Sequence, residues 1–382
     1  MAGNRYLTRY RATDELLKLF SKIDNRILPV IMPSVNNPEI IRVQQKQDEQ
    51  GSKSSKTLVD YQDTPLTQTM RKNLEFINKC LGRHWYDLEF DDQAIDQIQH
   101  EMLKEEQKIN GSDRHINFSK LSLHRVFNDP AFQTGGRFYG GWWQEIPKRF
   151  RSRIVINGKR TVEYDYSNVH PTMLYLLEGL EPPSDSYVDV VPDLKGWQCP
   201  NEGNMRKAVK LCFNAMVNAP KQMTRGPKEF RRSNCNCKWS ELTAAIVKRH
   251  QPIAKYFYSG AGIKLQRLDS DIAEMVMMHF ANMNYPVLPI HDSFILHHGL
   301  ESELQEMMER AFNRVIGGQV GVDKKKVEAF SNSPETSLFW ENNTIKEQND
   351  SEECLDYDVQ ELIESMNVGH HVRLTAFRAL KY

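Results

Sequence analysis

The sequence predicts an α+β fold in which amphipathic helices flank an antiparallel sheet. Two strand–turn–strand patterns indicate the sheet: β-forming residues flank Asn157-Gly158, and two further short strands flank His291-Asp292. Asn-Gly between alternating apolar residues is the strongest short hairpin signal. Longer segments with apolar side chains at helical spacing surround both hairpins. The chain has 382 residues, which allows two or three lobes, each with its own core.

The first part of the chain is predicted to be helical. Residues 1–43 carry an apolar stripe edged by basic side chains. Gln44 to Ser55 is polar and low in complexity, which is typical of a linker or mobile loop. Two amphipathic helices are expected next, over Leu66–Leu81 and Asp92–Ile109.

The middle of the chain mixes glycines, aromatics and cations over Gly135–Arg151, which predicts an ordered loop. Trp142 and Trp143 in it are expected to pack in a core rather than stack on bases. The hairpin that follows should end near Asp165. Further helices are expected over Val169–Glu178 with Pro171 in its first turn, over Met205–Ala219, within Glu241–Tyr258, over Ile263–Met283 and over Glu301–Ile316.

The net charge of zero hides a split. From Met205 to Gly260, twelve Lys or Arg stand against two acids, and from Glu335 to Ser365 ten acids stand against one base. The basic window can bind phosphates, although either window can also be a solvated surface. The acidic tail fits docking on a helicase or single-strand binder, or shielding of the basic groove, and equally a solvated tail. The cations expected to form a path for template phosphates are Lys221, Arg225, Lys228, Arg231 and Arg232.

Composition argues for a reducing cytoplasm and against a membrane. No apolar run approaches the roughly 18 residues of a membrane span, and the first 20 residues lack an apolar signal core. The six cysteines are scattered. Cys235 and Cys237, with Cys199 and His250 nearby in sequence, do not have a recognised zinc-ligand spacing, so zinc is not expected.

Two aspartates stand at matching places, Asp165 near a strand end and Asp292 in a hairpin turn. Strand ends of one sheet can bring two such carboxylates together, and two magnesium ions about 3.5–4 Å apart would offset their repulsion. Each also has a structural interpretation: Asp165 can cap the next helix, and Asp292 can simply make a turn.

A polar stripe on the helix predicted over Met205–Ala219 adds to this pair. Arg206, Lys210, Asn214 and Asn218 recur every four residues and therefore share one face. Arg206 and Lys210 lie one turn apart and could clamp a triphosphate. The alternative is an exposed basic helix without a ligand.

Together these pieces resemble the polymerase region of family A DNA polymerases, the bacterial DNA polymerase I type, and of the single-subunit phage RNA polymerases. The family's signatures occur in the family's order. They are Thr134 with Gly136-Arg137, then Gln144-Glu145-Ile146-Pro147, Asp165-Tyr166-Ser167, Arg206 with Lys210, Gln266 with Asp271, and His291-Asp292 followed by Ser293.

The resemblance implies a right-hand polymerase fold with an antiparallel palm sheet, helical fingers and a reduced helical thumb. In this fold Asp165 and Asp292 would bind two Mg²⁺ or Mn²⁺ ions. Arg206 and Lys210 would hold the incoming triphosphate, with Lys210 placed to protonate pyrophosphate. Arg137, Gln266 and His291 would contact the primer end or the minor groove. The implied parts are a helical N-terminal and thumb region over 1–128, palm over 129–200, fingers over 201–262, palm again over 263–334, and an acidic tail over 335–382.

Two departures from the family pattern bear on selectivity. Asn214, Asn218 and Ala219 replace the aromatic and glycine residues that line the family's nucleotide pocket. His170 stands at the sugar-selecting position, five residues after Asp165, where the family has Glu or Gly. Tolerance of both sugars is therefore expected, with Asn214, Asn218 and His170 near the nucleotide.

The small size favours a primase-like role. A reduced thumb grips a duplex poorly, and a poorly processive enzyme with a permissive pocket suits the synthesis of short primers. Gly135-Gly136-Arg137-Phe138-Tyr139 looks like small family-A-like primase-polymerases of mobile elements and phages. The expected substrates are a single-stranded or primed DNA template and NTPs or dNTPs. The alternatives are a short-product RNA polymerase, a terminal transferase, and, in another class, an inactive nucleic-acid-binding scaffold.

Overall fold

The computed structural model describes residues 39–46, 56–107, 116–188, 190, 202–231, 237–325 and 368–379. Contacts divide the chain into two compact units. Of the described residues, the larger unit contains 39–46, 56–84, 121–188, 190, 202–231 and 237–325. The smaller unit contains 85–107, 116–120 and 368–379.

An antiparallel sheet forms the centre of the larger unit, and β7 is its middle strand. Residues Tyr164 and Asp165 of β7 pair with β9 and with β10 at once, so these two strands lie on opposite edges of β7. Both predicted hairpins are present, and the predicted antiparallel sheet is confirmed. Its strands are β6 (Ile154–Ile156), β7 (Lys159–Ser167), β8 (Leu288–Ile290), β9 (Ser293–His297) and β10 (Gly321–Lys324).

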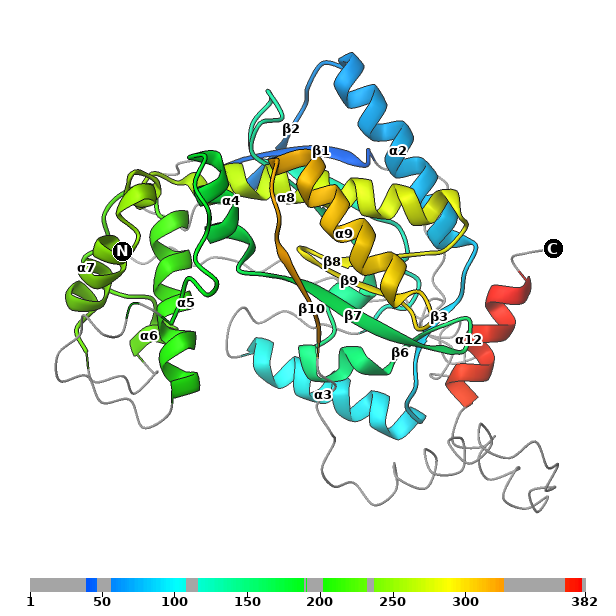
Figure 1. Cartoon of the computed structure of the whole chain (residues 1–382). Helices are drawn as coiled ribbons and strands as arrows, with labels where there is room; N and C mark the ends of the chain where they lie inside the picture. The colour runs from blue at the N-terminus through cyan, green and yellow to red at the C-terminus, as the bar shows by residue number, and fades with distance from the viewer. Residues whose placement is uncertain are drawn as a thin grey trace, which may run out of the picture. The chain divides into compact units, whose positions relative to one another are not determined.

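The two faces of β7 differ in chemistry because successive side chains point to opposite faces. Tyr164 and Tyr166 are buried, and the Tyr166 hydroxyl donates to the Met308 carbonyl of α9 (Glu301–Ile316) at 2.7 Å. In Figure 1, α9 and the long helix α8 (Ala261–Asn282) lie side by side over this sheet. Asp165 and its alternate neighbours therefore face away from α9.

A second sheet lies where the sequence predicted other structure. Its order is β2-β1-β4-β5, with β1 and β4 parallel and the other pairs antiparallel. The predicted helix over 1–43 is wrong at its end, and the predicted linker is wrong at its start, because Ile41–Lys46 is a strand; residues 1–38 and 47–55 lie outside the described part. The strands are β1 (Ile41–Lys46), β2 (Lys56–Val59), β4 (His124–Phe127) and β5 (Gly135–Tyr139).

Strand β5 replaces the first part of the loop predicted over Gly135–Arg151, and two short 3-10 helices, η2 (Trp142–Gln144) and η3 (Lys148–Arg153), follow it. Glycine is required in β5 because the strand approaches α8 closely. A Cβ on Gly136 would stand 2.7 Å from the Phe127 ring and 2.8 Å from the Ser270 hydroxyl. This close packing is not visible in a local sequence pattern.

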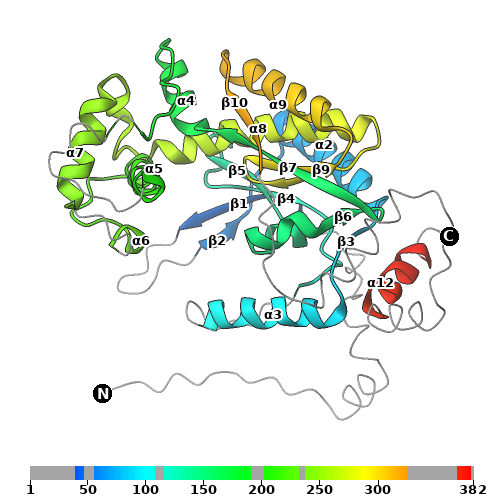
Figure 2. The ribbon, with the colours of Figure 1, turned by 60° about the horizontal axis from the view of Figure 1, so that its bottom comes forward.

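The predicted helices of the larger unit are present with small shifts of their ends. Helix α2 begins after Thr64, whose hydroxyl accepts from the Thr67 amide at 3.2 Å, and Pro65 occupies its first turn. Figure 2 shows α5, α6 and α7 grouped at one end of α8. The bounds are α2 (Pro65–Gly82), α4 (Val169–Leu177), α5 (Glu202–Asn218), α6 (Lys228–Arg231) and α7 (Trp239–Arg249), the last followed by the 3-10 helix η5 (Gln251–Tyr256).

The smaller unit contains β3 (Tyr86–Leu88), α3 (Asp92–Gln107) and α12 (Val368–Ala379). The C-terminal helix α12 is anchored by the ion pair of Arg373 with the fully buried Asp87, 2.9 Å apart. Burial makes such a pair costly to break. Residues 335–367 of the tail lie outside the described part.

Within the described residues, none of the helices combines the length and apolar character needed to cross a membrane.

Candidate active site

Sheet register brings Asp165 and Asp292 together. Asp165 is paired with Ser293 of β9, and Asp292 is the residue just before Ser293, in the two-residue turn between β8 and β9. Strand β7 extends two residues beyond the predicted end at Asp165. The following helix α4 begins at Val169 with Asn168 in the N-cap position, so Asp165 does not cap it.

The Asp165 carboxylate lies in a charged and mostly buried environment. Its pKa is raised from 3.8 to about 6, mainly by burial and next by the nearby negative charge of Asp292. The cations Lys325 and Lys210 act in the opposite direction. Lys325, the residue after β10, forms an ion pair with Asp165. The positive charges of Lys325 and Lys210 therefore compensate only part of the negative charge of Asp165 and Asp292.

Helix α5 carries two cations near the site, Arg206 and Lys210. The positive charge of Lys210 acts to lower the pKa of Asp165, so Lys210 lies near enough to that carboxylate for their charges to interact. The Arg206 guanidinium and the Lys210 ammonium lie 5.3 and 5.9 Å from the centre of the Tyr187 ring. Tyr187 is only 2% exposed, so it forms a fixed base under both cations.

Arg206 is held by neighbours that precede α5 in the chain. Its Nε donates to Asp185 Oδ2 at 2.6 Å, and its Nη2 donates to Asn168 Oδ1 at 3.4 Å. Asn168 follows β7 directly, so Arg206 lies beyond the carboxyl-terminal end of that strand. The sequence predicts that Arg206 holds a triphosphate, whereas in the structure its Nε is bonded to the Asp185 carboxylate.

The two amides of the same stripe lie further along α5. The Asn218 side chain donates to the Asn214 carbonyl at 2.8 Å. It also lies against α8, because a Cβ on Gly262 would stand 2.0 Å from Asn218 Oδ1. Asn218 therefore contributes to the contact between α5 and α8, and Asn214 is half-buried beside it.

Arg137 and His170 meet at one buried carboxylate, Asp269 of α8. Arg137 donates to Asp269 Oδ2 at 2.5 Å, and His170 Nε2 lies 3.5 Å from the same oxygen. Asp269 is only 4% exposed. Burial opposes any rise in the pKa of Arg137, but the charge and hydrogen bond of Asp269 raise that pKa, and the charge of Asp292 adds a smaller contribution.

His291 forms the turn beside Asp292 in a left-handed conformation, with φ of 59°. Its ring packs edge-on against Tyr139, with centroids 5.7 Å apart, and burial lowers its pKa. Among the described residues, no group hydrogen-bonds its buried Nδ1. Gln266 is half-buried on α8, and Asp271 pairs with the buried Arg125 at 3.2 Å.

The remaining predicted residues divide by exposure. Trp142 and Trp143 are fully buried, which confirms that they pack in the core. Lys221, Arg225 and Lys228 are exposed near α6. The Arg231 side chain and residue Arg232 lie outside the described part, as do Cys199 and Cys235. His250 bonds the Tyr175 hydroxyl and the Ser186 carbonyl, each at 2.9 Å, so both ring nitrogens are engaged without zinc.

Sequence reasoning missed four residues of the site: Lys325, Asp269, Asp185 and Tyr187. Lys325 belongs to a run of three lysines, which shows no preference for one position. Asp269 occupies a core position of an amphipathic helix, and a charged residue at such a position was an available signal. Asp185 and Tyr187 lie between predicted elements, where no periodicity applies.

The two aspartates suit a magnesium-type ion. Mg²⁺ prefers oxygen ligands and is usually bound by one or two carboxylates, waters and substrate phosphates. Asp165 and Asp292 supply such a pair of carboxylates. The Lys325 ammonium, which pairs with Asp165, shows that a positive charge is favourable at this position. Among the described residues, His, Cys, Asp and Glu form no group of three or more that could hold a metal without further ligands.

Comparisons with known proteins add little. No family model and no curated protein matches the sequence. Among solved structures, a match is found to the "POL domain of Pol1 from M. smegmatis complex with DNA primer-template and dNTP", with a TM-score of 0.37 and 11% identity. It covers 61% of this chain and 50% of that chain, so this chain spans half of that chain's length. A likeness at this TM-score carries no weight for function, and the proposal below rests on the geometry of the site.

Proposed function

We propose that the chain is a template-directed nucleotidyltransferase that joins a nucleotide from a triphosphate to a 3′ hydroxyl and can start strands without a primer. The observation that carries the proposal is the proximity of Asp165 on β7 to Asp292 in the β8–β9 turn, with the charge of Lys210 from α5 acting on Asp165. Carboxylates, a lysine and an arginine of opposite charge meet where a metal-bound triphosphate would fit.

The residues divide the chemistry between them. Asp165 and Asp292 would hold two divalent ions, which supply charge stabilisation for the attacking and leaving oxygens when bound. Arg206 would release Asp185 and donate two parallel hydrogen bonds to oxygens of the triphosphate. Lys210 would hold the leaving pyrophosphate and donate a proton from Nζ. Arg137, fixed by Asp269, and His291, the neighbour of Asp292 in the turn, would contact the attacking strand.

The finer statements belong to this proposal as well. We place the palm over 129–200 and 263–334, the fingers over 201–262 and the thumb within 1–128, with 335–382 as an acidic tail. The substrates would be single-stranded or primed DNA and NTPs or dNTPs, and the ions Mg²⁺ or Mn²⁺. Exposed cations beyond α5, such as Lys221, Arg225 and Lys228, would follow the template phosphates.

A synthesis assay on single-stranded DNA tests the proposal. It supplies labelled ribo- or deoxynucleotides with and without a primer, in Mg²⁺ or Mn²⁺, on templates of different sequence. Products without a primer would support primase activity and identify the sugar, and extension from a primer alone would indicate a repair polymerase. Products that ignore the template sequence would indicate a terminal transferase.

The matched control is Asp292→Ala. We expect it to reduce synthesis on the order of 1,000-fold or more, since it removes a ligand of the metal pair, while single-strand binding changes little. Normal synthesis by this variant would refute the site. If the wild-type chain binds single-stranded DNA but makes no product, a nucleic-acid-binding scaffold is favoured.

A further inference from the structure

A pocket adjoins Asp165 on the side of β7 away from Arg206. It is lined by β7 residues of 161–163, by η3 and by the end of β10, and its volume is about 60 Å³. Lys325 lines it and also pairs with Asp165, so the pocket opens beside the aspartates. On this measure it has room for roughly four water-sized groups, which is the size class of one phosphate with its four oxygens.

The pocket carries an excess of positive charge. Its five cationic side chains stand against the single carboxylate Glu163, and they are Lys148, Arg149, Arg151, Lys324 and Lys325. Two carboxylates outside it also pair with these cations, Asp165 with Lys325 and Glu301 with Lys324 at 3.5 Å. Such a concave cationic surface attracts anions.

Glu163, the carboxylate among the residues that line the pocket, is held in place by its own partners. Its Oε1 accepts from the Ser293 hydroxyl at 3.0 Å and lies 3.8 Å from Arg151 Nη1. Arg151 in turn donates to the Ile146 carbonyl at 3.2 Å, which fixes its guanidinium at the wall. The pocket is therefore a formed structure rather than a group of loose surface chains.

An unsatisfied donor points to a missing ligand. Ser152 lines the pocket, and among the described residues no group hydrogen-bonds its buried hydroxyl. A buried polar group without a partner is costly, and such groups in native structures often meet a water or an ion. A phosphate oxygen would accept from this hydroxyl and from the surrounding cations together.

Position along β7 indicates whose phosphate this is. Arg206 bonds Asn168, three residues after Asp165, while the pocket ends at Glu163, two residues before it. Because a strand rises about 3.3 Å per residue, the two anion-binding groups stand on opposite sides of the aspartates. One side suits the incoming triphosphate, and the other suits the reactant that brings the 3′ hydroxyl.

We propose that this pocket binds a phosphate of the nucleotide that supplies the 3′ hydroxyl: the 5′-triphosphate of an initiating nucleotide or a backbone phosphate of a primer. The assignment to that reactant rests on the proposed function, whereas the anion site itself does not. The pocket would hold the first nucleotide where no primer contacts yet exist, which is what a chain needs to start a strand.

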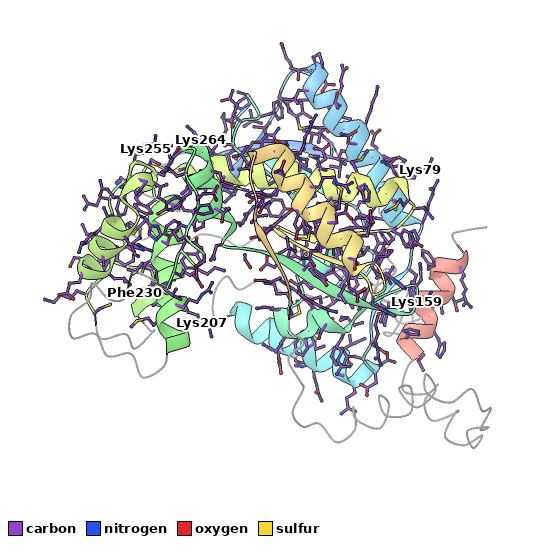
Figure 3. All side chains as sticks on the ribbon, viewed as in Figure 1. Lys79, Lys159, Lys207, Phe230, Lys255 and Lys264 are labelled. Atoms are coloured by element: carbon purple, nitrogen blue, oxygen red, sulfur yellow. The ribbon has the colours of Figure 1, made fainter. Side chains whose placement is uncertain are left out.

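Titration of the full chain with inorganic tripolyphosphate tests the anion site without any synthesis. The Arg206→Ala/Lys210→Ala background removes the other cationic site. Adding Lys148→Ala and Lys324→Ala, both exposed positions, should weaken binding at least tenfold, and Ser152→Ala should weaken it with the charge kept. Lys159→Ala, at the tip of the β6–β7 hairpin in Figure 3, is the matched control and should have no effect. Unchanged affinity in the pocket variants would overturn the proposal.

Synthesis then separates the two sources of phosphate. If the pocket holds the initiating triphosphate, Lys148→Ala/Lys324→Ala should raise its KM at least tenfold, with no change for an initiator that lacks 5′ phosphates. If it holds the primer, the variant should instead weaken primed extension. No change in any arm would overturn the assignment to this reactant. A third outcome separates the two proposals. If the variant loses tripolyphosphate binding but the wild-type chain makes no product in any assay, the pocket is upheld and the nucleotidyltransferase proposal is refuted.

Discussion

Lys325 and Asp165 form an ion pair across two neighbouring strands of the central sheet. The two residues are diagonal neighbours, since Asp323 is directly opposite Asp165 and Lys325 follows two residues later. The pair offsets part of the repulsion between Asp165 and Asp292, but the pKa of Asp165 remains raised. A divalent ion bound by the aspartates would take over this role from Lys325.

The raised pKa of Asp165 predicts a pH-dependent stability. Because the folded-state value of about 6 exceeds the ordinary 3.8, the favourable contribution is complete below about pH 4 and is lost as the pH rises through about 6. Two pKa units correspond to at most about 3 kcal/mol. Asp165→Asn should therefore raise the Tm by roughly 4–10 °C at about pH 8 in the presence of a chelator, and by much less at about pH 3.5.

Thermal unfolding at both pH values checks this. Asp60→Asn, at an exposed position, serves as the control and should behave like the wild type. An equal Tm difference at the two pH values would contradict the assignment of the effect to Asp165 ionisation.

Replacing Arg206 should affect nucleotide binding. Arg206→Lys keeps the charge but removes the fork, and one charge-assisted hydrogen bond is worth about 1.5–3 kcal/mol, or roughly 10–100-fold in nucleotide KM. Lys207→Ala, the exposed neighbour labelled on α5 in Figure 3, should leave the KM unchanged. Equal effects of the two changes would indicate general electrostatics rather than a clamp.

Asp185 should compete with the triphosphate for Arg206. Asp185→Asn weakens the 2.6 Å pair, so the nucleotide KM should fall by a few-fold, as exposed pairs contribute about 1 kcal/mol or less. Steady-state kinetics with varied nucleotide measures this. A raised KM would mean that Asp185 instead orients Arg206.

His170 should influence the choice of sugar. It stands in the first turn of α4, five residues after Asp165, with its Nε2 3.5 Å from Asp269. His170→Gly removes the ring from this place, and the ratio of ribo- to deoxynucleotide incorporation should change at least several-fold. The ratio is measured by competition between the two nucleotides, and an unchanged ratio would refute the role.

Arg125 should be a determinant of stability. It is fully buried, donates to the Gly136 carbonyl at 2.9 Å and to the Ser270 hydroxyl at 2.8 Å, and pairs with Glu274. Arg125→Met leaves the half-buried Glu274 without its cationic partner, which costs about 3–5 kcal/mol. Denaturant unfolding measures the loss, with the exposed Lys72→Met as control.

A double variant separates packing from charge. Adding Glu274→Met to Arg125→Met removes the unpaired acid and should restore part of the lost stability. No recovery would mean that the arginine acts through its bonds to Gly136 and Ser270, which hold β5 against α8.

Local patterns in the sequence predicted the central sheet and most helices correctly. Asn157-Gly158 and His291-Asp292 define two-residue turns between strands, and apolar periodicity located α2, α5, α8 and α9 to within a few residues. The same patterns missed β1, which has only two buried residues, Ile41 and Val43, in a polar segment. One of its two partners, β4, pairs with it in parallel and lies far along the chain, so no local turn signal predicts that pairing.

By itself, the sequence determined which side chains are available for chemistry: Asp165, Asp292, Arg206 and Lys210, each on a predictable element. Only the tertiary structure decided their partners, because Lys325 meets Asp165 through strand register, and Arg137 meets Asp269 through the packing of β5 on α8. Periodicity describes the faces of single elements. Ion pairs and pockets depend on which faces meet, and that is set by burial of the whole core.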